Sequence, residues 1–263
     1  MGTVSRRFRA GMTQRIPNPL PIDTPKEIIL RWLQEGEIQL LGLIPWGSNA
    51  TFLVAVVYED ITGLAIYKPQ RGEEPLWDFP HGTLCYREVA AYVVSEALGW
   101  GLVPPTVLRH VGPYGRGALQ CYVEADPEEH YFTFRCDPAL QPILMRLAVF
   151  DLITNNADRK AGHCLKDHSG RIWAIDHGIC FHTEPKLRTV IWDYQGQTIP
   201  EDIVEEVRAF QQRLKSDVDL QETLAGLLHP QEIKAMDERV VALLKCPVFP
   251  LPGPWRSVPW PLI

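Results

Sequence analysis

The strongest constraint on the fold is the order of the sequence patterns: β-type runs dominate the first half of the chain and helical patterns the second. Five short β-type runs are predicted to be strands: 38–43, 51–58, 64–67, 106–111 and 118–124. Helical patterns occur at 24–36, 86–98, 139–153, 200–214, 218–228 and 230–245, and a hairpin pattern at 163–175. This segregated order predicts an α+β fold and argues against βαβ repeats.

The same patterns predict how the chain is divided. We expect the following segments: a flexible tail over 1–23, a strand-rich lobe over 24–124, a hinge or linker over 125–138, a helical lobe over 139–246 and a Pro-rich tail over 247–263. The linker is indicated by its polar, turn-rich composition. A chain of 263 residues is long enough for two modest lobes.

Charge and composition argue against several classes of protein. The formal net charge is −6, so we do not expect a nucleic-acid partner, which would need a clustered basic face. The basic cluster of Arg6, Arg7, Arg9 and Arg15 is expected to be a solvated tail. No run is long and apolar enough for a transmembrane segment, and no signal peptide is recognisable. The six cysteines are scattered without a CxxC pair, so we expect reduced thiols in a cytoplasmic protein.

Two aspartates flank the expected hairpin in the helical half. Asp158 lies in the motif Asn-Ala-Asp-Arg at 156–159, and Asp176 lies in Ile-Asp-His-Gly at 175–178. Apolar residues bracket each acid, so we expect both at strand or loop ends that face one cleft. Phosphoryl transfer needs two such carboxylates, one to accept the proton of the attacking hydroxyl and one to hold the metal that bridges the ATP phosphates. Taken singly, each acid could instead cap a turn or end a strand.

Three further features fit a nucleotide site, and each also has an ordinary explanation. Lys68 ends an apolar strand, from which a lysine can reach phosphates or simply extend into solvent. Glu88 lies early in the helix over 86–98, where an acid complements the helix dipole and could also pair with Lys68. Gly47 and Ser48 lie in the turn between the first two strands, which could cover a triphosphate or be a plain hairpin turn.

Histidines and cysteines between positions 163 and 182 offer a competing interpretation. They are His163, Cys164, His168, His177, Cys180 and His182. Zinc accepts these ligand types, but no pair has the spacing of a finger, a knuckle or an HExxH helix. A zinc-stabilised scaffold without enzymatic activity and a Cys–His enzyme therefore stay open as alternatives.

The order of the motifs resembles the phosphatidylinositol 3-/4-kinase-like branch of the protein-kinase fold. Lys68-Pro69, Glu88, the 156–159 motif and the 175–178 motif follow one another as in that family. Type II phosphatidylinositol 4-kinases and HipA-type bacterial toxin kinases are similar, and the resemblance extends to an uncharacterised actinobacterial group. It covers about residues 38 to 200. It implies a bilobal fold with a β-rich N-lobe containing one long helix, a mostly helical C-lobe, and ATP between them.

The resemblance implies roles for residues of the N-lobe. Lys68 would contact the α- and β-phosphates of ATP and pair with Glu88. The backbone around Val123 would receive the adenine. Gly47 and Ser48 fall in the glycine-loop region, which is shorter and less Gly-rich than in ordinary protein kinases, as in the lipid-kinase-like branch.

In the C-lobe the resemblance implies that Asp158 is the catalytic base, with Arg159 beside it, and that Asp176 is the principal Mg²⁺ ligand. His163 stands where the family usually has an asparagine as the second metal contact. An imidazole suits Mn²⁺ better than Mg²⁺, so this departure would tilt metal preference or weaken the kinase.

We therefore predict an ATP-dependent phosphotransferase that uses Mg²⁺ or Mn²⁺ and transfers the γ-phosphoryl group to a hydroxyl. The acceptor can be a protein, a lipid or a small molecule, although the acidic net charge mildly disfavours a membrane lipid. Two alternatives on the same fold are a nucleotide-binding pseudokinase, suggested by His163, and an enzyme that transfers AMP.

Overall fold

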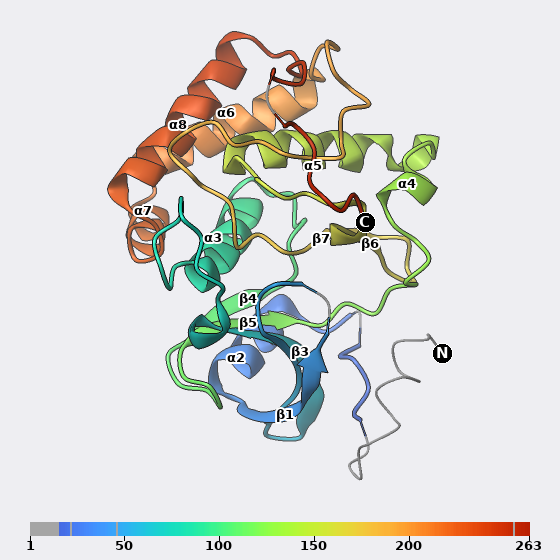
Figure 1. Cartoon of the computed structure of the whole chain (residues 1–263), viewed down its shortest axis with the longest axis vertical. Helices are drawn as coiled ribbons and strands as arrows, with labels where there is room; N and C mark the ends of the chain where they lie inside the picture. Colours follow the sequence, from blue (N-terminus) through green and yellow to red (C-terminus); the bar gives the residue numbers. More distant parts are fainter. Residues whose placement is uncertain (1–15, 22, 46, 255) are drawn as a thin grey trace.

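The computed structural model describes residues 16–263 except 22, 46 and 255, so the N-terminal arginine cluster and most of the expected tail lie outside the described residues. An antiparallel sheet with two helices precedes a helical part that contains a two-stranded hairpin (Figure 1). The helices are α2 (Lys26–Glu35), α3 (Leu84–Ala97), α4 (Tyr131–Phe134), α5 (Gln141–Thr154), α6 (Glu201–Ser216), α7 (Val218–Ala225) and α8 (Pro230–Lys245). The strands are β1 (Glu37–Ile44), β2 (Thr51–Tyr58), β3 (Ile61–Pro69), β4 (Thr106–Arg109), β5 (Gly117–Cys121), β6 (Cys164–Lys166) and β7 (Ile172–Ala174).

The five-stranded sheet has the order β1-β2-β3-β5-β4, and its two faces are covered by different helices. On one face, Trp32 of α2 packs against Val54 and Leu119. On the other, Val89 of α3 packs against Ala118. Because side chains alternate along a strand, this division determines which β3 residues point toward α3.

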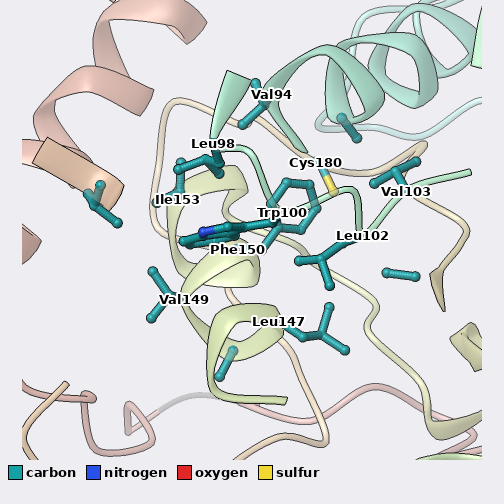
Figure 2. Close-up of a cluster of buried hydrophobic side chains, with 14 of the residues drawn as sticks. Val94, Leu98, Trp100, Leu102, Val103, Leu147, Val149, Phe150, Ile153 and Cys180 are labelled. Atoms are coloured by element: carbon teal, nitrogen blue, oxygen red, sulfur yellow. The ribbon is translucent and has the colours of Figure 1, made fainter. Parts of the chain in front are cut away.

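The helical part is organised around α5, whose side chains are mostly apolar. Figure 2 shows α5 meeting side chains of α3 and of the loop that follows α3 in one buried cluster, which includes Trp100 and Phe150. Phe150 and Leu147 are fully buried, and Trp100 is 8% exposed. Burial of large aromatic and aliphatic side chains is the main stabilising contribution here, at about 1.5–3 kcal/mol for each one. Since α3 contributes to this cluster and also covers the sheet, it joins the two halves of the molecule.

The predicted α+β order is confirmed, with differences at the ends of elements. β3 begins at Ile61 because the turn after β2 is only two residues long, with Glu59 at a φ of 50°, and Ile61 pairs with Tyr58. Gly63 therefore lies within β3, where a Cβ atom would come within 2.6 Å of Leu20.

The segment 125–138 contains the short helix α4, and the division of the chain at this segment stays a prediction. In the part of the chain that the structure describes, no helix combines the length and apolarity needed to cross a bilayer.

Candidate active site

Three charged side chains from β3, α3 and the segment after β7 meet at one point. The Lys68 ammonium donates to Glu88 Oε1 and, over 3.1 Å, to Asp176 Oδ1. The other oxygen of Glu88 accepts a hydrogen bond from the backbone N–H of His177 at 3.0 Å. The side chain of Glu88 is 3% exposed, whereas that of Asp176 is 48% exposed. Glu88 is thus the buried link in this triad, and Asp176 is its solvent-accessible member.

Local structure explains why these side chains converge. Lys68 pairs with Ala118 across β3 and β5, so it lies on the face of the sheet that α3 covers. Glu88 follows Cys85 by three residues in α3 and therefore shares its inward side of the helix. Asp176 comes two residues after β7 and has a φ of 62°, in the left-handed region that Asp tolerates better than most residues. Strained backbone of this kind is often found at functional sites.

Opposite charges dominate the pKa shifts of Lys68 and Asp176, whereas burial raises the pKa of Glu88 although Lys68 opposes it. The charge of Lys68 holds the pKa of the Asp176 carboxyl far below its ordinary value, although burial acts in the opposite direction. Burial lowers the pKa of Lys68, but the carboxylates of Asp176 and Glu88 outweigh it and raise the pKa above the ordinary range. At neutral pH the site therefore presents an ammonium group and an ionised Asp176, which are the groups needed to contact phosphate and a hard cation.

His163 lies on the other side of Asp176, with its Nε2 atom 3.3 Å from Asp176 Oδ2. Burial, helped by nearby cations, lowers the pKa of His163 to about 4, so the ring is neutral at neutral pH. The Lys160 backbone N–H donates to Nδ1 over 3.4 Å, which assigns the ring proton to Nε2, the nitrogen 3.3 Å from Asp176 Oδ2. To bind a cation through Nε2, His163 would have to move this proton to Nδ1 and lose the Lys160 hydrogen bond.

Asp158 lies in the loop that follows α5. Its backbone N–H donates to the side-chain oxygen of Asn156 at 2.9 Å, which closes a local turn. Its carboxylate is 26% exposed and lies 3.2 Å from the Lys160 ammonium. Burial raises the pKa of Asp158 despite Lys160, and the negative charge of Asp176 adds to the increase. A partly exposed carboxylate with a raised pKa suits a general base.

Arg159 points away from solvent into a buried network. It forms an ion pair at 3.0 Å with Asp151 of α5, and both side chains are fully buried. It also donates to the Ile175 carbonyl at 2.8 Å and contacts His177 Nε2 at 2.7 Å, while Asn156 donates to Asp151 at 3.1 Å. Arg159 thereby connects α5 to the loops that hold Asp158 and Asp176. Our sequence reasoning missed Asp151, although an acid within the apolar run 147–153 is a signal that could have found it.

The other three predicted site residues make none of these contacts. Gly47 and Ser48 lie in the turn between β1 and β2, where Gly47 has a φ of 106° and open space around its Cα. Val123 follows β5, and within the described part of the chain its backbone N–H and C=O have no hydrogen-bond partner. It also borders a cavity of about 450 Å³, which Lys68 and Asp176 do not line.

The donor atoms fit a divalent cation held jointly with phosphate better than a structural zinc ion. Among the described residues, no three His, Cys, Asp or Glu side chains are placed to enclose a metal. Cys164 and Cys180 are buried, free thiols whose pKa burial raises to about 12 and beyond, so they are poor thiolate ligands and poor nucleophiles. Mg²⁺ sites in phosphotransferases commonly use one or two carboxylates and complete their coordination with water and substrate phosphates, which matches a single accessible Asp176.

Several known structures share the fold of this chain. The Golgi casein kinase with Mn/ADP bound has a TM-score of 0.56 and 14% identity, covering 84% of this chain and 74% of that one. Hydra Fam20 with sugar has a TM-score of 0.52 and 15% identity, covering 87% and 90%. The Helicobacter pylori proinflammatory kinase CtkA has a TM-score of 0.52 and 12% identity, covering 82% and 94%. The protein therefore has a protein-kinase-like fold with a β-rich lobe and a helical lobe, as predicted.

The sequence comparison is more specific. Protein Rv2133c of Mycobacterium tuberculosis is 40% identical to this chain, over 87% of this chain and 93% of its own length. The chain belongs to the family of that protein. No protein-family model matches the chain.

Proposed function

We propose that the protein is an ATP-dependent kinase of the phosphatidylinositol 3-/4-kinase-like branch. The observation that carries this proposal is the triad of Lys68, Glu88 and Asp176, which three separate elements bring together. Its charges match the phosphates and the divalent cation of a metal–nucleotide complex. The kinase-like fold supports the proposal, although fold alone does not establish function.

The nucleobase would lie on the same face of the sheet as Lys68. Leu53, Ala55 and Leu64 are buried on that face, with Ile66 and Tyr122 partly buried beside them. These apolar side chains would pack against adenine. The unpaired backbone groups of Val123 would donate to and accept from the adenine edge, as the sequence resemblance implies. Gly47 and Ser48 would cover the phosphates.

The chemistry would be in-line transfer of the γ-phosphoryl group. Asp158 accepts the proton of the acceptor hydroxyl as the new oxygen–phosphorus bond forms and the bond from the γ-phosphorus to the bridging oxygen of ADP breaks. A divalent cation held by Asp176 would neutralise charge on the phosphate oxygens. Lys68 orients the α- and β-phosphates, and Glu88 holds Lys68 in position. Arg159 fixes the loops through its buried contacts. A protein, lipid or small-molecule hydroxyl can serve as the acceptor.

A nucleotide-binding pseudokinase is the second candidate, and one observation favours it. Each carboxylate oxygen of Asp176 has a close neighbour, since Lys68 donates to Oδ1 and His163 Nε2 lies 3.3 Å from Oδ2. A cation must displace one of these contacts before Asp176 can bind it. If that displacement is too costly, the protein binds nucleotide without transfer.

The products formed from ATP distinguish the candidates. We expect ³¹P NMR of ATP incubated with the protein and Mn²⁺ or Mg²⁺ to show ADP, together with inorganic phosphate or phosphorylated protein, because water and the chain's own hydroxyls can act as slow acceptors. AMP with pyrophosphate or adenylylated protein would instead identify an AMP-transferring enzyme. ATP that stays intact although it binds would favour the pseudokinase.

A further inference from the structure

One buried arginine next to Glu88 joins three distant segments. Arg87 is 1% exposed, and its guanidinium donates to the Cys180 carbonyl at 2.6 Å and forms an ion pair with Glu232 at the start of α8. The same group lies over the ring of Phe79, 4.9 Å from its centre. Arg87 therefore ties α3 to the loop before it, to the segment after Asp176 and to the helical lobe.

Arg87 and Glu88 are consecutive, so two different sides of the same turn of α3 are each held by a contact. Glu88 contacts Lys68 and the His177 backbone, while Arg87 contacts the helical lobe. An outward shift of α3 that carries Arg87 along with Glu88 would also separate Arg87 from Glu232 and break this buried ion pair. Separating the partners of a buried ion pair is strongly unfavourable. The form of the protein in which α3 has shifted outward should therefore be rare.

The loop over 73–82 holds α3 from its N-terminal end. The Glu73 carboxylate accepts the backbone N–H groups of Leu84 and Cys85, at 3.1 and 2.8 Å, in the first turn of α3. Further along the loop, Asp78 forms a largely buried ion pair with Lys186, at 2.8 Å. The loop therefore connects the start of α3 to the segment beyond Asp176. Figure 2 shows a third connection, in which Val94 of α3 and Leu98 just after it share a buried cluster with side chains of α5.

We propose that Arg87 is a positioning residue, which acts with Glu232 to hold α3 so that Glu88 keeps Lys68 directed at the nucleotide. This inference rests on the proposed function.

Arg87→Met tests the proposal because methionine keeps apolar bulk and removes the guanidinium. Two quantities are measured at a temperature where every variant is folded: the Kd of a non-hydrolysable ATP analogue with Mn²⁺, and hydrogen exchange of the α3 amides by mass spectrometry. We expect Kd to rise about tenfold or more and α3 to exchange faster. Arg87→Lys, which can still pair with Glu232, should recover part of both losses.

Arg146→Met is the matched control, since Arg146 is largely buried and forms ion pairs with Asp202 and Glu206 within the helical lobe. It should lower stability but leave Kd and α3 exchange near wild-type values. If wild type binds the analogue and Arg87→Met binds it equally well, the positioning role is wrong. Unchanged α3 exchange in Arg87→Met would also overturn it. Failure of the wild-type protein to bind any nucleotide would instead refute the proposed function on which the inference depends.

Discussion

Asp158→Ala should reduce nucleotide turnover by at least about 100-fold, because it removes the only proposed proton acceptor for the attacking hydroxyl. Asp158 pairs with Lys160 and makes no contact with Lys68 or Glu88. The affinity for the nucleotide should therefore change by less than about threefold in this variant. Turnover is measured as ADP formation, and affinity by calorimetry. Near-normal turnover in this variant would show that Asp158 is not the base.

The pH dependence of turnover gives a second test of the same role. Asp158 must be ionised to accept a proton, so turnover should rise with pH as its carboxyl titrates and then level off. Because burial raises the pKa of Asp158, the rise should occur above the ordinary aspartate value of 3.8. The residual rate of Asp158→Ala should lack this step. Asp219→Ala, which removes an exposed acid of α7, should keep both the wild-type rate and the step.

Arg159→Met should lower the free energy of unfolding by about 3–5 kcal/mol, because it leaves the fully buried Asp151 without its charged partner. Urea unfolding followed by circular dichroism measures this loss. Arg208→Met is the surface control, since the pair that Arg208 forms with Glu205 is largely exposed and should contribute at most about 1 kcal/mol.

The double variant Asp151→Met/Arg159→Met separates the contribution of the pair from that of each charge. Asp151→Met removes the carboxylate that Arg159→Met leaves unpaired. The loss of unfolding free energy in the double variant should therefore be smaller than the sum of the losses in the two single variants. A loss in Arg159→Met no larger than in Arg208→Met would mean that the buried pair does not hold the loops together.

Much of the fold was predictable because its helices and strands have clear periodic patterns. The strand at 51–58 was predicted with its observed bounds, and the helix predicted at 86–98 is observed at Leu84–Ala97, within two residues at each end. The main difference is β3, which begins at Ile61 because the turn after β2 is only two residues long and Ile61 pairs with Tyr58. Residues that favour turns can belong to the adjacent strand, and the sequence alone does not show which of them do so.

The predicted contact between Lys68 and Glu88 is present because both residues lie in regular elements whose inward sides are readable from the sequence. The roles proposed for these and the other site residues stay predictions. Arg87 and Glu232 were not recognised, since 145 positions separate them and each resembles an ordinary charge on an amphipathic helix. Buried ion pairs between distant elements are set by tertiary packing, which sequence periodicity does not record.

The central claim is that Asp176 and Lys68 form a site for a metal–nucleotide complex. Calorimetric titration of a non-hydrolysable ATP analogue, with Mn²⁺, with Mg²⁺ and with a chelator, tests it in the wild type beside Asp176→Asn. We predict that either cation tightens binding to the wild type and that this dependence disappears in Asp176→Asn. A bound analogue at a hundred times its Kd should also add about 2.7 kcal/mol to the free energy of unfolding. No binding under any condition, or equal metal dependence in Asp176→Asn, would contradict the claim.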